Sequence, residues 1–130
     1  LYDYHTLTED EAIRIKTYNL ETIIAEKIHT IFVRGEFNSR NKDFFDIYIL
    51  NKLKRNQIDV KVLKEAFKNT FAYRQTDLNV EEIRTVLNSI SENPLMENRW
   101  KSFTHKNPFA EEILFTDTII AVLEVVDLIS

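Results

Sequence analysis

The stretch LETIIAEKIHTIFVR, residues 20–34, decides the fold of this chain. On a helix that turns by about 100° per residue, Leu20 and the four isoleucines of the stretch share one face. Asn19 stands directly before the stretch, and asparagine is a preferred N-cap because its side chain accepts a hydrogen bond from the first turn. The pattern predicts an amphipathic helix that packs its isoleucine face against other helices.

The segments after residue 34 have the same helical character. A short loop, residues 35–40, holds the only glycine of the chain and makes the next helix an antiparallel neighbour of the first. Residues 115–129 are rich in β-branched side chains, which favour a strand, but their length and apolar spacing favour a buried helix. The helices expected after the first are residues 41–55, a helix starting at Val60, a helix capped by Asn79, a short helix around Trp100 and Phe103, and residues 115–129.

Residues 1–17 have a different pattern. Tyr2, Tyr4 and Thr6 alternate with other residues, and Ile13 and Ile15 alternate with charged residues after a polar turn. Alternation on both sides of a turn indicates a β-hairpin, which is only marginally stable by itself. The sequence therefore predicts two parts: residues 1–17, a hairpin that belongs to a sheet whose other strands lie upstream in a longer protein, and residues 18–130, a helical domain.

The composition supports a mainly α fold. The chain has 130 residues, 44% hydrophobic and 29% charged, with one glycine and two prolines, too few turn residues for a sandwich or barrel. It has no cysteine, which excludes disulfides and thiolate metal sites and favours a cytoplasmic location. No stretch approaches the roughly 20 apolar residues of a membrane span, so we expect no membrane partner.

Charge is unevenly distributed along the chain. The net charge is −4, yet residues 27–68 contain ten Lys and Arg residues against five Asp and Glu residues. A locally basic surface suits a phosphate-rich partner, although charged helix faces are most often just solvated.

Four charged residues fall at positions where core residues are expected. On the helical wheel, Lys27 and Arg34 lie inside the isoleucine face of the first helix, where an unpaired cation is costly to bury. In the second helix, Asp46 falls within the apolar face and Asp43 lies beside Leu50. Because the two helices are expected to be neighbours, we predict that the aspartates meet the cations. This group is either a buried structural network or a polar functional cleft, and spacing alone leaves both open.

Residues 18–50 contain four short motifs in a fixed order. They are the pair Leu20-Glu21, the triplet Ala25-Glu26-Lys27, the following Arg34, and the motif Arg40-Asn41-Lys42-Asp43-Phe44-Phe45-Asp46, an Arg-x-Lys-Asp-apolar-apolar-Asp pattern. Together they resemble the signature of the AbiEii/AbiGii-type nucleotidyltransferase toxins, a bacterial family. In that family the signature follows a nucleotidyltransferase-type sheet, so the resemblance implies that the hairpin of residues 1–17 is a remnant of that sheet.

The resemblance implies roles for particular residues. It implies that Lys27 contacts the triphosphate of an NTP and that one of Asp43 and Asp46 supports catalysis, without showing which. Arg34, Arg40 and Lys42 match basic positions of the motif and are the further candidates for phosphate binding. Glu21 and Glu26 also match, but the wheel places them away from the face of the lysine, so we expect structural roles for them.

The same resemblance implies the reaction and its context. Members of this toxin group, from toxin–antitoxin and phage abortive-infection systems, transfer a nucleotide from an NTP with Mg²⁺ to an acceptor that can be a tRNA. Their metal-binding loop contains Gly-(Ser/Gly)-Thr, which this chain lacks because its single glycine is followed by glutamate. We therefore expect the Mg²⁺ ligands upstream and this piece alone to be inactive. The alternative is a non-catalytic helical module that binds protein or RNA, and an antitoxin is a further possible partner.

Overall fold

The computed structural model describes residues 19–35 and 41–130, and within these ranges it is helical throughout, with no strands. The mainly α class predicted from the sequence is confirmed. The predicted hairpin at residues 1–17 lies outside the described residues. The elements are α2 (Leu20–Arg34), α3 (Asn41–Lys54), η3 (Arg55–Gln57), α4 (Val60–Tyr73), α5 (Val80–Glu92), α6 (Pro94–Lys106), η4 (Pro108–Ala110) and α7 (Phe115–Leu128), where η marks a 3₁₀ turn.

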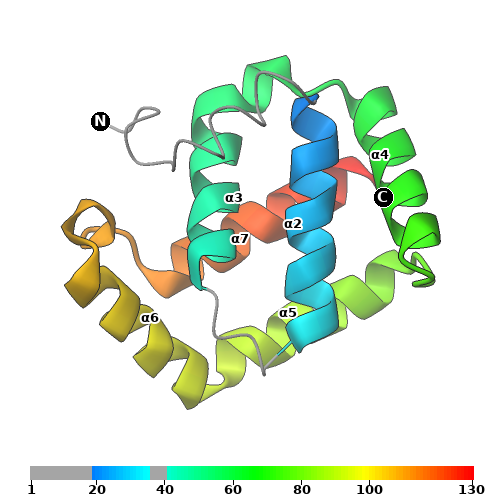
Figure 1. Cartoon of the computed structure of the whole chain (residues 1–130). Helices are drawn as coiled ribbons and strands as arrows, with labels where there is room; N and C mark the ends of the chain where they lie inside the picture. The colour runs from blue at the N-terminus through cyan, green and yellow to red at the C-terminus, as the bar shows by residue number, and fades with distance from the viewer. Residues whose placement is uncertain (1–18, 36–40) are drawn as a thin grey trace.

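The helices surround a central pair. Helices α2 and α3 lie side by side and antiparallel, with α4 on the other side of α2 and α7 crossing behind α3 (Figure 1). Helix α5 runs across the end of α2 where α2 finishes, and α6 lies beside the end of α3 where α3 begins. The antiparallel arrangement of the first two helices, predicted from their short connection, is confirmed.

Side chains at the helix starts explain why the helices begin where they do. The Oδ1 of Asn19 accepts a hydrogen bond from the N–H of Thr22 at 2.7 Å, and Asn79 caps α5 in the same way. Asn93 caps α6, whose first residue is Pro94, a residue suited to the start of a helix because it has no N–H. Both caps predicted from the sequence, Asn19 and Asn79, are confirmed.

Gly35 closes α2. Its φ is +51°, a left-handed conformation that favours glycine, and its N–H bonds the carbonyl of Ile31. The only glycine of the chain therefore stands at the point where the backbone must turn toward α3.

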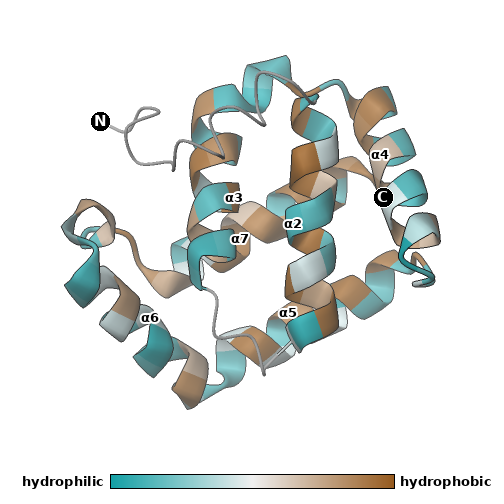
Figure 2. Cartoon of the chain, in the orientation of Figure 1, coloured by the Kyte–Doolittle hydropathy of each residue, from teal (hydrophilic) through white to brown (hydrophobic). Residues whose placement is uncertain are grey.

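The core is built around α3, which is buried on most of its circumference. Phe44, Phe45 and Ile47 are fully buried although they point in different directions around the helix. The hydropathy view shows apolar residues on the inner sides of the surrounding helices, whereas α4 and α5 carry polar residues outside (Figure 2). The ring of Trp100 closes one end of this core, and its Nε1 donates to the carbonyl of Ile113 at 2.9 Å.

The last segment, for which the sequence left a strand or a helix open, is a helix. Residues Phe115–Leu128 form α7, and at the start of this helix the Asp117 carboxylate accepts a hydrogen bond from the backbone N–H of Leu114. Among the described residues, no helix has both the length and the apolar character needed to cross a membrane.

Candidate functional site

Asp46 is the centre of the charged group. Its side chain is 0% exposed, and each of its carboxylate oxygens contacts a lysine ammonium. The Nζ of Lys27 lies 2.7 Å from Oδ2, and the Nζ of Lys42 lies 2.8 Å from Oδ1. A buried carboxylate is costly unless its charge is compensated, and here two cations from two helices compensate it.

Asp43 lies one turn earlier on the same face of α3. Its Oδ1 is 3.9 Å from the Nζ of Lys27, at the outer limit of an ion pair, and its side chain is also buried. Its position in the first turn of α3 adds a favourable interaction with the helix dipole. Lys27 therefore stands between two carboxylates, closer to Asp46 than to Asp43.

Lys27 reaches this place because of its position on α2. It lies between the isoleucines that pack against α3 and α4, and its side chain is 15% exposed. The aliphatic part of a lysine can lie along apolar surface while the ammonium keeps polar partners. The prediction that Lys27 faces the aspartates of the neighbouring helix, with a nitrogen within ion-pair distance, is confirmed.

Arg34 does not join this group, and that part of the prediction is wrong. It is the last residue of α2 and is exposed, and the cations within 4 Å of Asp43 and Asp46 in the described part of the chain are Lys27 and Lys42. Seven residues of helix span about 10 Å. Because Lys27 is level with Asp46 on an antiparallel neighbour, Arg34 is level with a point beyond Asn41, where α3 begins. The wheel shows direction around the axis but not distance along it.

The other basic candidates have different outcomes. Arg40 lies outside the described residues. Lys42 lies on α3 four residues before Asp46 and, besides its ion pair, its ammonium is 5.8 Å from the ring centre of Phe45. Sequence reasoning took Lys42 only as a phosphate-binding candidate and missed its pairing with Asp46, although i,i+4 spacing of opposite charges is a recognised signal.

Glu21 has a structural contact, in agreement with the wheel. Its buried carboxylate accepts a hydrogen bond from the backbone N–H of Asp59 at 2.8 Å. Asp59 in turn caps α4 by accepting from the N–H groups of Lys61 and Val62. Glu21 thus ties the start of α2 to the start of α4, at the opposite end of α2 from Gly35.

The aspartates do not fit a magnesium site. Mg²⁺ needs carboxylate oxygens that are available to it, and in Asp46 each oxygen holds a lysine ammonium. Among the described residues there is also no group of three or more His, Asp or Glu side chains that could hold a metal ion. What the arrangement can do chemically is fix two ammonium groups in place, beside a second carboxylate.

The comparison with known proteins gives the identity of the chain at the level of family. The sequence model of the family described as "Nucleotidyl transferase AbiEii toxin, Type IV TA system" matches residues 1–123. No curated protein and no solved structure matches the chain. The family match spans the whole charged site and all helices up to most of α7. This chain therefore belongs to the AbiEii nucleotidyltransferase toxin family of type IV toxin–antitoxin systems.

Proposed function

We propose that this chain is the helical part of a nucleotidyltransferase toxin that transfers a nucleotide from an NTP to an acceptor. The observation that carries the proposal is the position of Lys27, a half-buried cation held at 2.7 Å by Asp46 and flanked by Asp43. A cation fixed in this way is suited to binding a phosphate group, because its ordering is complete before the ligand arrives.

Asp46 is proposed to position the lysines and not to accept a proton. Both of its oxygens are already occupied by ammonium groups, so its role is to hold Lys27 and Lys42 in place. Asp43, at 3.9 Å from Lys27, is the better candidate for a base. In the reaction an acceptor oxygen bonds the α-phosphorus of the NTP, pyrophosphate leaves, and the acceptor hydroxyl loses its proton.

Charge neutralisation is the main requirement of such a transfer, because there is little other chemistry for the protein to do. Lys27 is proposed to contact the triphosphate, with Lys42, Arg34 and Arg40 as further phosphate contacts. Mg²⁺ is expected to neutralise the phosphates, and since Asp43 and Asp46 do not form a metal site, we propose that its ligands are other residues.

The acceptor is proposed to be a nucleic acid, such as the 3′ end of a tRNA. Among the cations of the basic segment, residues 27–68, it is Lys27 and Lys42 of the charged site that support a phosphate-rich partner. A cytoplasmic location and regulation by a cognate antitoxin are proposed on the basis of family membership.

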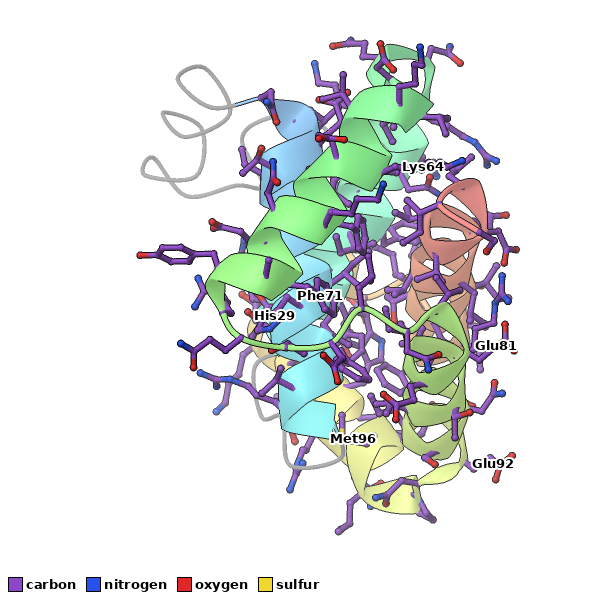
Figure 3. The ribbon with its side chains drawn as sticks, turned by 90° about the vertical axis from the view of Figure 1, so that its right-hand side faces the viewer. His29, Lys64, Phe71, Glu81, Glu92 and Met96 are labelled. Carbon is purple, nitrogen blue, oxygen red and sulfur yellow. The ribbon has the colours of Figure 1, made fainter. Side chains whose placement is uncertain are left out.

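A radiolabel assay tests the proposal. Full-length protein is incubated with each of the four α-labelled NTPs, Mg²⁺ and total tRNA, in parallel with the 130-residue chain alone. We expect label transfer by the full-length protein with one or more NTPs, and none by the chain alone. Transfer should disappear in Lys27→Met and persist in Lys64→Met, a matched change of an exposed lysine on α4 (Figure 3).

The outcome also separates the two functional classes. If no NTP labels any RNA or protein while the chain still binds a partner, the alternative of a non-catalytic interaction module is correct. Transfer by the 130-residue chain alone would show that the active site lies within these residues.

A further inference from the structure

Lys42 stands between a carboxylate and an aromatic ring of its own helix. Its Nζ lies 2.8 Å from the Oδ1 of Asp46 and over the ring of Phe45, 5.8 Å from the ring centre. Residues three and four positions apart are neighbours on a helix surface, so both partners lie within reach of Lys42. A cation about 6 Å or less from a ring centre is attracted by the negative face of the ring. The carboxylate and the ring therefore fix the ammonium from two sides.

The ring of Phe45 is in turn held by rings from much later in the chain. Phe45 is 0% exposed, and its ring meets that of Phe109 in a T-shaped contact with centroids 5.1 Å apart. Phe103 of α6 contacts the same ring, with centroids 6.1 Å apart. Aromatic pairs prefer T-shaped and offset arrangements, which restrict how each ring turns. The orientation of Phe45 therefore depends on residues of α6 and η4.

Phe109 has a fixed place because the turn that carries it is anchored in the core. It is the middle residue of η4, and the next residue, Ala110, is 0% exposed. The N–H of Ala110 bonds the carbonyl of Asn107 at 2.9 Å. Beyond the turn, the carbonyl of Ile113 accepts from the Trp100 indole at 2.9 Å. The turn therefore presents the half-buried ring of Phe109 from an anchored backbone.

These contacts form an unbroken series that ends at the charged site. Phe109 contacts Phe45, whose ring lies under the Lys42 ammonium. Lys42 binds the carboxylate of Asp46, which Lys27 reaches from α2, a different helix. The side chain of Lys27 is 15% exposed, against 29% for Lys42. Support from η4 therefore bears on Lys42 directly and on Lys27 only through Asp46.

We propose that Phe109 is a positioning residue for the NTP: acting through the ring of Phe45, it holds the Lys42 ammonium in the orientation that binds a phosphate. The lysine stem is flexible, so an ammonium that is ordered before the ligand arrives binds it at a smaller cost in conformational entropy. The inference rests on the proposed function, because it takes Lys42 as one of the phosphate contacts.

The first measurement is the order of the lysine side chains in the 130-residue chain without nucleotide. NMR relaxation of the lysine ε-methylene groups is compared between the wild type and Phe109→Leu, which keeps apolar bulk and removes the ring. We expect the Lys42 side chain to become more mobile and that of Lys27 to change little. Phe32→Leu is the matched control, since Phe32 is also half-buried and pairs with a ring of α4, Phe71. It should leave Lys42 unchanged.

The second measurement shows whether Phe109 acts on the nucleotide through Lys42. The KM and kcat for the NTP are measured on full-length wild type, Phe109→Leu, Lys42→Met and the double variant. A cation–π contact at a partly exposed site corresponds to about two- to five-fold in affinity, so we expect KM to rise by up to about five-fold in Phe109→Leu, with kcat nearly unchanged. In the Lys42→Met background the same change should have no further effect, whereas damage to packing alone would act equally in both backgrounds.

Two further variants guard against a folding defect. Phe109→Tyr keeps a ring at the same place and should restore both the order of Lys42 and the KM to near wild-type values. Phe109→Met takes the place of the leucine variant if that variant does not fold.

Two results would overturn the inference: a Lys42 side chain as ordered in Phe109→Leu as in the wild type, or effects of Phe109→Leu and Lys42→Met on KM that simply add. Failure of the two proposals can also be told apart. Loss of Lys42 order in Phe109→Leu, without transfer by the wild type from any NTP, refutes only the proposed function. Transfer by a wild type whose Lys42 does not depend on Phe109 refutes only the inference.

Discussion

Lys27 and Asp46 form an ion pair of 2.7 Å across the α2–α3 interface, and a second lysine, Lys42, occupies the other oxygen of the same carboxylate. The side chain of Asp46 is 0% exposed, whereas those of Lys27 and Lys42 are 15% and 29% exposed. The carboxylate is thus buried between two cations that both keep a path to solvent. This asymmetry decides how substitutions in the site should behave.

Replacing Lys27 should separate activity from stability. Lys27→Met keeps the aliphatic bulk and leaves Asp46 still paired with Lys42, so the buried carboxylate is not stranded. Removing one partner of a buried ion pair generally costs about 3–5 kcal/mol, and we expect a much smaller change here, of either sign. In the full-length protein we expect a nearly unchanged thermal melt and loss of nucleotide transfer and toxicity.

One result would contradict a functional role for Lys27. A large fall in melting temperature, with transfer retained in the folded fraction, would make Lys27 a structural residue. Lys42→Met is the matched change on the other oxygen of Asp46, and comparison of the two variants shows whether the lysines act differently.

Replacing Asp46, unlike replacing Lys27, should reduce the stability of the fold. Asp46→Asn leaves two ammonium groups without the carboxylate that both contact, and although each can turn toward solvent, we expect destabilisation toward the lower end of about 3–5 kcal/mol. Urea denaturation of the variant against wild type measures this. A variant as stable as the wild type would show that the free-energy cost of burying the Asp46 carboxylate equals the free energy gained from its two ion pairs.

His29 should make the protein less stable in mild acid. Burial lowers the pKa of His29, the charge of Arg74 lowers it further, and Glu26 opposes the shift. The ring lies between α2 and α4, with Nε2 at 2.9 Å from the Thr76 hydroxyl and its edge against Phe71 (Figure 3). The unfolded chain therefore takes up a proton near pH 6.5 while the folded chain does not.

The sign of the pH dependence follows from that difference. The contribution of His29 is fully present above about pH 6.5 and is lost as the pH falls through the lowered pKa, by at most about 1.4 kcal/mol per pH unit. Urea midpoints between about pH 5 and pH 8 measure it, with His29→Gln as the variant that should flatten the slope. An unchanged slope in His29→Gln would assign the pH dependence to other groups.

Trp100 offers a test of packing at the end of the core. Trp100→Phe keeps an aromatic ring but removes the Nε1–H that bonds the carbonyl of Ile113 in a buried environment. Leaving such an acceptor unsatisfied costs about 1–3 kcal/mol, to which the smaller ring adds a cavity term. Chemical denaturation followed by circular dichroism measures the loss, and a change below about 0.5 kcal/mol would mean that Ile113 finds another donor.

Local sequence signals predicted the helices well because several of the helix starts have a local cause. Asn19 and Asn79 are caps, and Pro94 starts α6. The apolar spacing of residues 115–129 correctly outweighed their β-branched composition, because one face of this helix is buried against α3 and α5.

The charged site was only partly predictable, for two physical reasons. A helical wheel contains no position along the axis, so it grouped the exposed Arg34 with Lys27. It also shows no contacts between helices, so it did not show that Asp46 is shared by Lys42 of its own helix and Lys27 of α2.

The central place of α3 has a consequence for synthesis on the ribosome. Its partner α7 begins at Phe115, 61 residues after the end of α3 at Lys54. At about 5–20 residues per second, α7 is made roughly 3–12 s after α3, and during that interval one side of α3 has no cover. The nascent chain can pair Lys27 with Asp46 early, but it holds that pair in a buried setting only after α7 has been made. The charged site is therefore encoded early in the chain and assembled only after a helix that is synthesised much later.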